Sequence, residues 1–324
     1  MKLALKKGLN RDAHIYFWGR KSFPEVEAFA EQNGMKIFRV EDGFIRSVGL
    51  GSDLTQPYSQ VIDRRGIYFD PTCESDLENY LNFYDFSSDA KLLERAKNIQ
   101  TEIIKNKISK YNADASKALR LPQDKITAVV IGQVQDDASI KFGADGMTNL
   151  ELLKQVKAAY PERYTIFKPH PDVLSGNRVG NVERQEALKY CDEVVSDISI
   201  ADVLEAVDEV HTMTSLTGFE GLLYGKKVYT YGMPFYAGWG LTTDTQSCER
   251  RKREVSVEEL IAATYLLYPR YISVKTKEFC EAERVIKELK EQKDAMQASF
   301  ILRSKSKIYS YFSRISQKLL SLVG

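Results

Sequence analysis

The segment Ile126–Ile131 is a run of mostly β-branched and apolar residues that ends directly before a polar loop, Gly132–Ser139. Such a run is typical of a central strand in a parallel sheet, where both faces are buried. A helical pattern follows at Asn149–Ala159, and Tyr164–Lys168 is again strand-like. This alternation predicts an α/β fold with a parallel, doubly wound sheet in this half of the chain.

The first 120 residues repeat the alternation. Strands are expected at His14–Trp18, Lys36–Val40 and Gly66–Phe69, and helices at Phe23–Gln32, from Ser75–Tyr80 onward and at Ser88–Leu119. The polar stretch Leu121–Lys125 is the expected boundary between the two halves.

The second half continues with strands expected at Asp192–Val195, Glu209–Thr212 and Lys227–Tyr231, and helices at Ser199–Val207, Thr217–Tyr224, Ser256–Leu267 and Glu278–Gln292. We therefore expect four parts: an N-terminal domain (1–120), a second domain (121–255), C-terminal helices (256–295) and a tail (296–324).

Charge and cysteine usage exclude several classes of protein. The 324 residues include 46 Lys and Arg against 45 Asp and Glu, so the basic excess of a nucleic-acid binder is missing. The four cysteines are scattered without CxxC spacing, as expected for reduced thiols rather than zinc ligands. No apolar run is long enough for a transmembrane helix, and we expect a cytoplasmic protein.

Two adjacent carboxylates, Glu41 and Asp42, follow the expected strand Lys36–Val40. A carboxylate at the end of a strand can be the general base that deprotonates an acceptor hydroxyl. An ordinary acidic turn is the alternative. The polar and glycine-containing stretch Arg46–Ser52 favours the functional interpretation, because it would line the same place.

The loop Gly132–Ser139 stands where doubly wound sheets bind their ligands, at the carboxyl end of a strand. Asp136 or Asp137 could attack the anomeric carbon of a sugar and hold a covalent glycosyl intermediate. The alternative is an aspartate that only caps the next helix.

Lys168-Pro169-His170-Pro171-Asp172 follows another expected strand and contains one of the three histidines. The two prolines fix the backbone around His170, and an imidazole there could hold a leaving phosphate. A purely structural histidine is the alternative.

The stretch His211–Glu220 runs from a strand through hydroxyl residues into a helix. Backbone N–H groups and the dipole at a helix start suit a phosphate or a carboxylate. Thr217 and Glu220 also fit a capping box, and both interpretations can hold together.

Nothing in these motifs has the aspartate-x-aspartate pattern of a nucleotide–metal site, so we expect no metal and no cofactor. The basic run Arg250–Arg253 could attract an anionic ligand, or it could be a solvated turn. The tail after residue 296 is basic and apolar at helical spacing. This pattern favours a peripheral anchor on a membrane surface over a helix packed on the protein.

In order along the chain, these motifs resemble the capsular polysaccharide β-Kdo transferases of the KpsC/LipA-like family, in the form of a single module. The strings that carry the resemblance are Glu41–Ser52, Gly132–Ile140, Lys168–Val173, His211–Lys227, Gly232–Thr242 and Leu267–Tyr271. The resemblance implies a GT-B-like fold, with two Rossmann-like domains facing a cleft and an acceptor on the N-terminal side. It implies retaining transfer of Kdo, an acidic octulosonic sugar, from CMP-Kdo to a saccharide or lipid-linked acceptor. It also implies that the membrane surface expected for the tail is that of the inner membrane.

The resemblance also suggests roles for individual residues. Asp137 would be the nucleophile, and Glu41 or Asp42 would be the base for the acceptor. The expected donor-binding residues are Gln133, Ser139, Lys168, His170, Pro171, Ser215, Thr217 and Glu220. A transferase for another CMP-linked acidic sugar, such as sialic acid, and a non-catalytic capsule-assembly scaffold are the alternatives.

Overall fold

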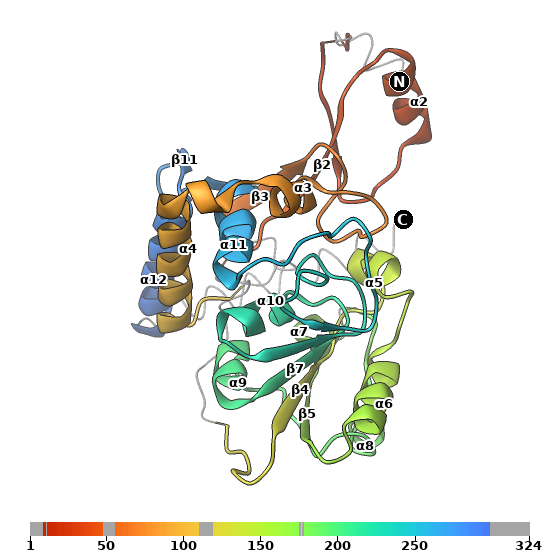
Figure 1. The fold of residues 1–324 in the computed structure, drawn as a ribbon, viewed down its shortest axis with the longest axis vertical. Coiled ribbons are helices and arrows are strands. Elements are labelled where there is room, and N and C mark those ends of the chain that lie inside the picture. The colour runs from red at the N-terminus through yellow and green to blue at the C-terminus, as the bar shows by residue number, and fades with distance from the viewer. Residues whose placement is uncertain are drawn as a thin grey trace.

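The computed structural model describes residues 9–10, 12–47, 56–109, 119–174, 176 and 178–298. It has two lobes, each built on one sheet (Figure 1). The expected tail lies outside the described residues beyond Ala298, and so does the segment 48–55 with its glycines.

The sheet of the second lobe is parallel throughout and runs in the order β6-β5-β4-β7-β8-β9. Its strands are β4 (Thr127–Ile131), β5 (Tyr164–Lys168), β6 (Glu193–Val194), β7 (Glu209–Thr212), β8 (Lys227–Thr230) and β9 (Thr243–Asp244). Numbered within this sheet the order is 3-2-1-4-5-6, which is the order of a Rossmann fold. Every residue of β4 is buried, as its sequence predicts for a central strand.

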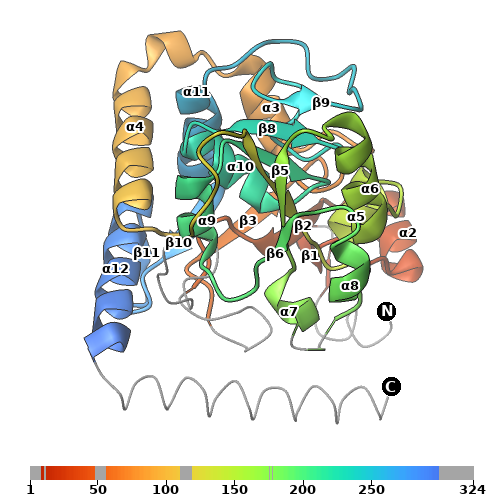
Figure 2. The same ribbon diagram turned by 90° about the horizontal axis from the view of Figure 1, so that it is seen from below.

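Helices cover both faces of this sheet, with α9 and α10 on one side and α5, α6 and α8 on the other (Figures 1 and 2). They are α5 (Ala138–Gly143), α6 (Asn149–Ala159), α7 (Pro171–Leu174), α8 (Arg184–Ala187), α9 (Ile200–Ala206) and α10 (Leu216–Leu223). The prediction of a doubly wound sheet is confirmed for this lobe.

The first lobe has a mixed sheet in the order β1-β2-β3-β10-β11. Its strands are β1 (Ile15–Trp18), β2 (Ile37–Asp42), β3 (Ser59–Asp63), β10 (Pro269–Ile272) and β11 (Phe279–Cys280). Only β1 and β2 are parallel, because β3 returns antiparallel to β2 and the last two strands continue in that manner.

The prediction of a strand at Gly66–Phe69 is wrong, because these residues form no strand and the third strand is Ser59–Asp63. Asp63 ends that strand, because its carboxylate accepts the backbone N–H groups of Arg65 and Gly66. This is an Asx-turn, the local hydrogen bonding with which aspartate competes against a strand.

The helices of the first lobe are α2 (Pro24–Gln32), α3 (Asp76–Phe83) and α4 (Ala90–Lys105), with a 3₁₀ turn at Phe86–Ser88. The C-terminal segment supplies α11 (Val257–Ile261), a π-helical turn (Ala262–Leu267) and α12 (Ala282–Ala298). Because β11 occupies the start of the helix expected at Glu278–Gln292, this segment contributes strands as well as helices. Helices α4 and α12 lie side by side (Figures 1 and 2).

An aromatic seam joins the lobes. Phe44 of the first lobe lies 4.9 Å from Phe235 of the second, and Phe219 lies 5.3 Å from Tyr265, measured between ring centroids. All four are buried in one continuous core. The lobes are therefore held together by apolar burial as well as by the covalent chain.

The basic run also joins the lobes, and neither interpretation given for it fits Arg250 and Arg251. Both guanidinium groups bind Glu78 of α3, with Nε–Oε distances of 2.7 and 3.2 Å. Arg251 is buried and also donates to the carbonyl oxygens of Pro234 and Ala237. Burial lowers the pKa of Arg251, and the neighbouring Glu78 opposes this shift.

Candidate active site

A cavity of about 620 Å³ lies where the two lobes meet. On the second lobe it opens at the carboxyl ends of β4 and β7, the neighbouring strands at which the strand order reverses. This is the switch point at which doubly wound sheets bind ligands. The cavity is lined by every residue to which the resemblance assigns a role: Glu41, Asp42, Gln133, Asp137, Ser139, Lys168, His170, Pro171, Ser215, Thr217 and Glu220.

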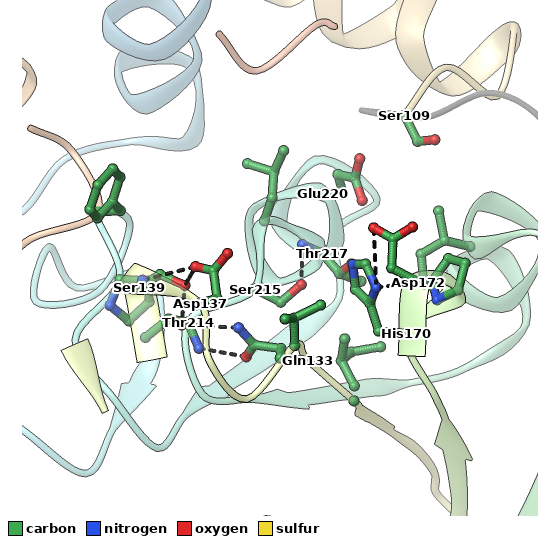
Figure 3. A pocket seen from close by; sticks show the side chains of 18 of the residues that line it. Ser109, Gln133, Asp137, Ser139, His170, Asp172, Thr214, Ser215, Thr217 and Glu220 are labelled. Carbon is green, nitrogen blue, oxygen red and sulfur yellow. Dashed lines mark hydrogen bonds and ion pairs between the residues drawn. The ribbon is translucent and has the colours of Figure 1, made fainter. Parts of the chain in front are cut away.

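Asp137 stands at the start of α5 as its N-cap. Its Oδ1 accepts the backbone N–H of Ser139 at 2.9 Å and the hydroxyl of the same residue at 2.7 Å. Both bonds use one oxygen, which leaves Oδ2 for a ligand in the cavity (Figure 3). The capping and functional interpretations of this residue are therefore compatible.

Asp136 lies elsewhere. Its side chain is 57% exposed, and its Oδ1 is 3.1 Å from Nη2 of Arg178. Asp136 does not line the cavity, whereas Arg178 does. The fold thus distinguishes two adjacent aspartates that the sequence leaves equivalent.

Gln133 is buried and connects two loops of the cavity. Its Oε1 accepts the hydroxyl of Thr212 and the backbone N–H of Thr214, and its Nε2 donates to the Thr214 hydroxyl at 3.0 Å. Thr214 in turn donates to Ser139. These bonds hold the loop after β4, which carries Asp137, against the loop after β7 (Figure 3).

Helix α10 points its N-terminus into the cavity. Ser215 is the N-cap, and its Oγ accepts the backbone N–H of Thr217 at 3.2 Å. Glu220 is too far from this cap for a capping box, but it is buried and lines the cavity. The positive end of the helix dipole therefore faces the cavity, where it favours an anion.

Tyr236 fixes this helix start from behind. Its hydroxyl donates to the carbonyl oxygen of Ser215, and burial raises the pKa of Tyr236 far above its ordinary range. The ring also fills the space beside Gly218. A protonated phenol is thus a permanent donor at this position.

The segment after β5 contributes to the opposite side of the cavity from Asp137 (Figure 3). Nδ1 of His170 accepts the backbone N–H of Asp172 at 3.1 Å, which assigns the imidazole proton to Nε2. Lys168 is buried, and its ammonium donates to the carbonyl oxygen of Ile198 at 2.6 Å. Pro171 begins the short helix α7.

The two carboxylates of the first lobe are the last residues of β2 rather than a loop after it. Oε1 of Glu41 accepts the backbone N–H of Asp42 at 3.0 Å. Oδ2 of Asp42 lies 2.5 Å from Nε of Arg46, which is buried. Because β2 ends at the cavity, both carboxylates line it, although successive side chains of a strand point to opposite faces.

Sequence reasoning missed several lining residues: Tyr68, Phe69, Ser109, Arg178, Thr214 and Phe235. Phe235 lies within the string Gly232–Thr242, so the resemblance could have indicated it. Tyr68 and Phe69 were assigned to a strand. Arg178 stands on an irregular loop, and no local pattern places it beside the site.

Among the described residues, no group of three or more His, Cys, Asp or Glu side chains is arranged to hold a metal ion. In the same part of the chain, no helix is both long and apolar enough to cross a membrane.

Comparison with known proteins gives consistent matches. The family described as "Capsule polysaccharide biosynthesis protein" matches residues 13–271. The chain is 45% identical over 294 residues to the capsule polysaccharide modification protein LipA of Neisseria meningitidis serogroup A, covering 90% of this chain and 41% of LipA. It is 40% identical over 283 residues to the lipopolysaccharide-processing protein LpsZ of Rhizobium meliloti, covering 86% of this chain and 64% of LpsZ. The chain thus spans about two fifths of the length of LipA.

Two solved structures are similar over most of the chain, and both are of Thermosulfurimonas dismutans KpsC. The β-Kdo 2,4 transferase gives a TM-score of 0.77 at 35% identity, covering 85% of this chain and 86% of that one. The β-Kdo 2,7 transferase gives a TM-score of 0.72 at 40% identity, covering 90% and 88%. These matches confirm the expected GT-B-like fold class.

Proposed function

The chain belongs to the capsule polysaccharide biosynthesis protein family, and we propose that it is a retaining β-Kdo glycosyltransferase. It would transfer Kdo from CMP-Kdo to a saccharide or lipid-linked acceptor. The observation that carries the proposal is the cavity at the switch point, which brings carboxylates of both lobes together with a helix N-terminus. Retaining transfer needs two carboxyl groups and a site for the departing phosphate.

The second lobe would hold the donor. The start of α10, with Ser215 and Thr217, suits the phosphate of CMP or the carboxylate of Kdo. Nε2–H of His170 would donate to the leaving phosphate and stabilise its charge as the bond to the sugar breaks. The carboxylate of Glu220 can accept hydrogen bonds from hydroxyl groups of the donor.

Asp137 would be the nucleophile, because it lines the cavity, whereas Asp136 does not line it and is paired with Arg178. An oxygen of Asp137 would attack C2 of Kdo, and CMP would leave with the bonding electrons on its phosphate oxygen. The acceptor hydroxyl would then attack C2 from the opposite face and restore the carboxylate. Two inversions give net retention.

Glu41 or Asp42 would take the proton of the acceptor hydroxyl in the second step. Asp42 is held by Arg46, so this ion pair has to rearrange if Asp42 is to accept a proton. Oε1 of Glu41 accepts the backbone N–H of Asp42. Either carboxylate would serve as the base, and the other would orient the acceptor.

Intact-protein mass spectrometry after mixing the protein with freshly generated CMP-Kdo, without acceptor, tests the proposal. We expect a mass increase of one Kdo unit that is absent in Asp137→Ala and present in Asp136→Ala. An adduct with CMP-sialic acid but not with CMP-Kdo would replace the donor. If the protein forms no adduct, releases no CMP and transfers Kdo to no acceptor, the result would support the non-catalytic scaffold instead.

A further inference from the structure

The outer strand of the first sheet has two different faces. Ile15 and Phe17 of β1 are buried against α2, whereas His14, Tyr16 and Trp18 are exposed on the other face. The exposed fractions are 52% for Tyr16 and 42% for Trp18. Large aromatic side chains gathered on an open sheet face are unusual unless they bind something.

These side chains form an ordered surface with their neighbours. Tyr16 is in register with Phe38 of β2 and stacks on it, at 5.1 Å and 20° between the rings. His14 lies 5.2 Å from the same ring, and the guanidinium of Arg64 lies 5.9 Å from it. We call His14, Tyr16, Trp18, Phe38 and Arg64 the aromatic platform.

Arg64 gives the platform a positive charge. It is exposed, and its backbone N–H rather than its guanidinium binds Asp76. The adjacent Arg65 is paired with Glu74 and Asp76, whereas no ion pair of Arg64 is found among the described residues. The guanidinium of Arg64 can therefore bind a carboxylate brought by a ligand.

The platform leads to the cavity. Trp18 is in register with Val40, and Glu41 and Asp42 complete β2 at the cavity wall. Residues Phe38, Val40 and Asp42 alternate onto the same face of the strand, which is the platform face. Figure 1 shows these red strands rising away from the rest of the molecule, with α2 alongside.

We propose that the aromatic platform binds the acceptor as an acidic oligosaccharide, several sugars back from the hydroxyl that reacts. Pyranose rings present a face of C–H groups that stacks on Tyr16 and Trp18. The carboxylates of acidic sugars would form ion pairs with Arg64. The strand from His14 to Trp18 is about 13 Å long, which accommodates more than one sugar. This inference rests on the proposed function and assigns its acceptor class.

Trp18 fluorescence tests the binding without any turnover. The chain has two tryptophans, and Trp239 is fully buried, so Trp18 is the one that a ligand on the platform contacts. We expect a saturable emission change with a β-Kdo trisaccharide glycoside, which Trp18→Phe abolishes and Arg64→Ala weakens. No change, or an equal change with a neutral trisaccharide of the same length, would overturn the inference.

Kinetics test the role in transfer. The double variant Tyr16→Ala/Trp18→Ala should raise KM for the trisaccharide glycoside about tenfold and leave KM for a single-Kdo glycoside unchanged. Phe279→Ala is the matched control, since Phe279 is an aromatic residue 76% exposed on the opposite edge strand of the same sheet. Equal effects on long and short acceptors would refute the platform as a subsite.

Measuring the Kdo adduct formed without acceptor distinguishes a failure of the proposed transferase function from a failure of the aromatic platform as an acceptor subsite. An unchanged adduct in the double variant shows that the donor chemistry is intact, so that any kinetic result concerns the platform alone. If the unaltered protein forms no adduct and transfers no Kdo, the proposed function fails. The fluorescence titration then decides on its own whether the platform binds the acidic trisaccharide.

Discussion

Replacing Glu78 with glutamine should weaken the junction between the lobes more than any exposed charge change. Glu78 lies on α3 of the first lobe and is 4% exposed. Its two carboxylate oxygens bind Arg250 and Arg251, so it links two cations to one anion. Glutamine keeps the size and one acceptor oxygen but removes the negative charge.

The loss of stability depends on which of the two arginines is left without its ion pair. The Arg251 side chain is only 3% exposed, so its charge cannot be solvated after the substitution. Leaving a buried charge unpaired costs about 3–5 kcal/mol. Since Arg251 keeps its bonds to the carbonyl oxygens of Pro234 and Ala237, we expect the lower end, about 3 kcal/mol.

Thermal unfolding followed by circular dichroism measures this loss, which corresponds to a fall in Tm of about 4–5 °C for a chain of 324 residues. Glu281→Gln is the matched control, because the Glu281 side chain pairs with Arg95 but is 75% exposed. We expect only a small change there. The loop at Pro234 also lines the cavity, so KM for the donor should rise in Glu78→Gln.

Equal Tm values for the Glu78 and Glu281 variants would refute the reasoning, since burial would then not govern the cost. A large loss in Glu78→Gln that is fully restored by adding Arg251→Met would support it, because the second change removes the unpaired charge.

Single substitutions around the second sheet give three further expected outcomes. Gln133→Leu removes the bonds to Thr214 and should cost about 1–3 kcal/mol of stability while lowering kcat for transfer; unchanged kcat would show that the loop holds without the amide. Gly218→Ala places a Cβ 2.2 Å from the Tyr236 hydroxyl and should cost about 1–3 kcal/mol, measured by urea unfolding; an unchanged midpoint would contradict this. Burial lowers the pKa of His211 below its ordinary 6.5, so below about pH 6.5 the unfolded chain binds a proton that the folded chain does not, and stability falls as the pH decreases. Tm measured from pH 7.5 to 5 should fall less steeply in His211→Gln than in the unaltered protein. Parallel Tm curves for the two proteins would show that His211 does not cause the pH dependence.

The second lobe could be predicted from the sequence because its information is local. Its strands β4 and β5 are buried and largely apolar, and the polar residues that follow Ile131 and Lys168 mark the ends of these strands. Parallel strands bring these ends to one edge. That is why motifs far apart in the chain could be expected at one site.

The first lobe was less predictable because its sheet depends on distant pairing. Nothing near Val61 indicates that Pro269 will be its partner on the next strand. The turn at Asp63 is decided by side-chain hydrogen bonds that compete with the strand. The partners of Arg250 and Arg178 likewise come from remote segments, so their roles emerge only in the folded chain.

The pairing of β3 with β10 has a consequence for synthesis of the protein on the ribosome. The second sheet is complete once residues 127–244 have emerged, since all its strands lie in that continuous segment. The first sheet, although its synthesis begins earlier, has to wait for residues 269–280. The N-terminal strands thus remain without their last partners while the second lobe forms beside them, and the lobe made first is the last to be finished.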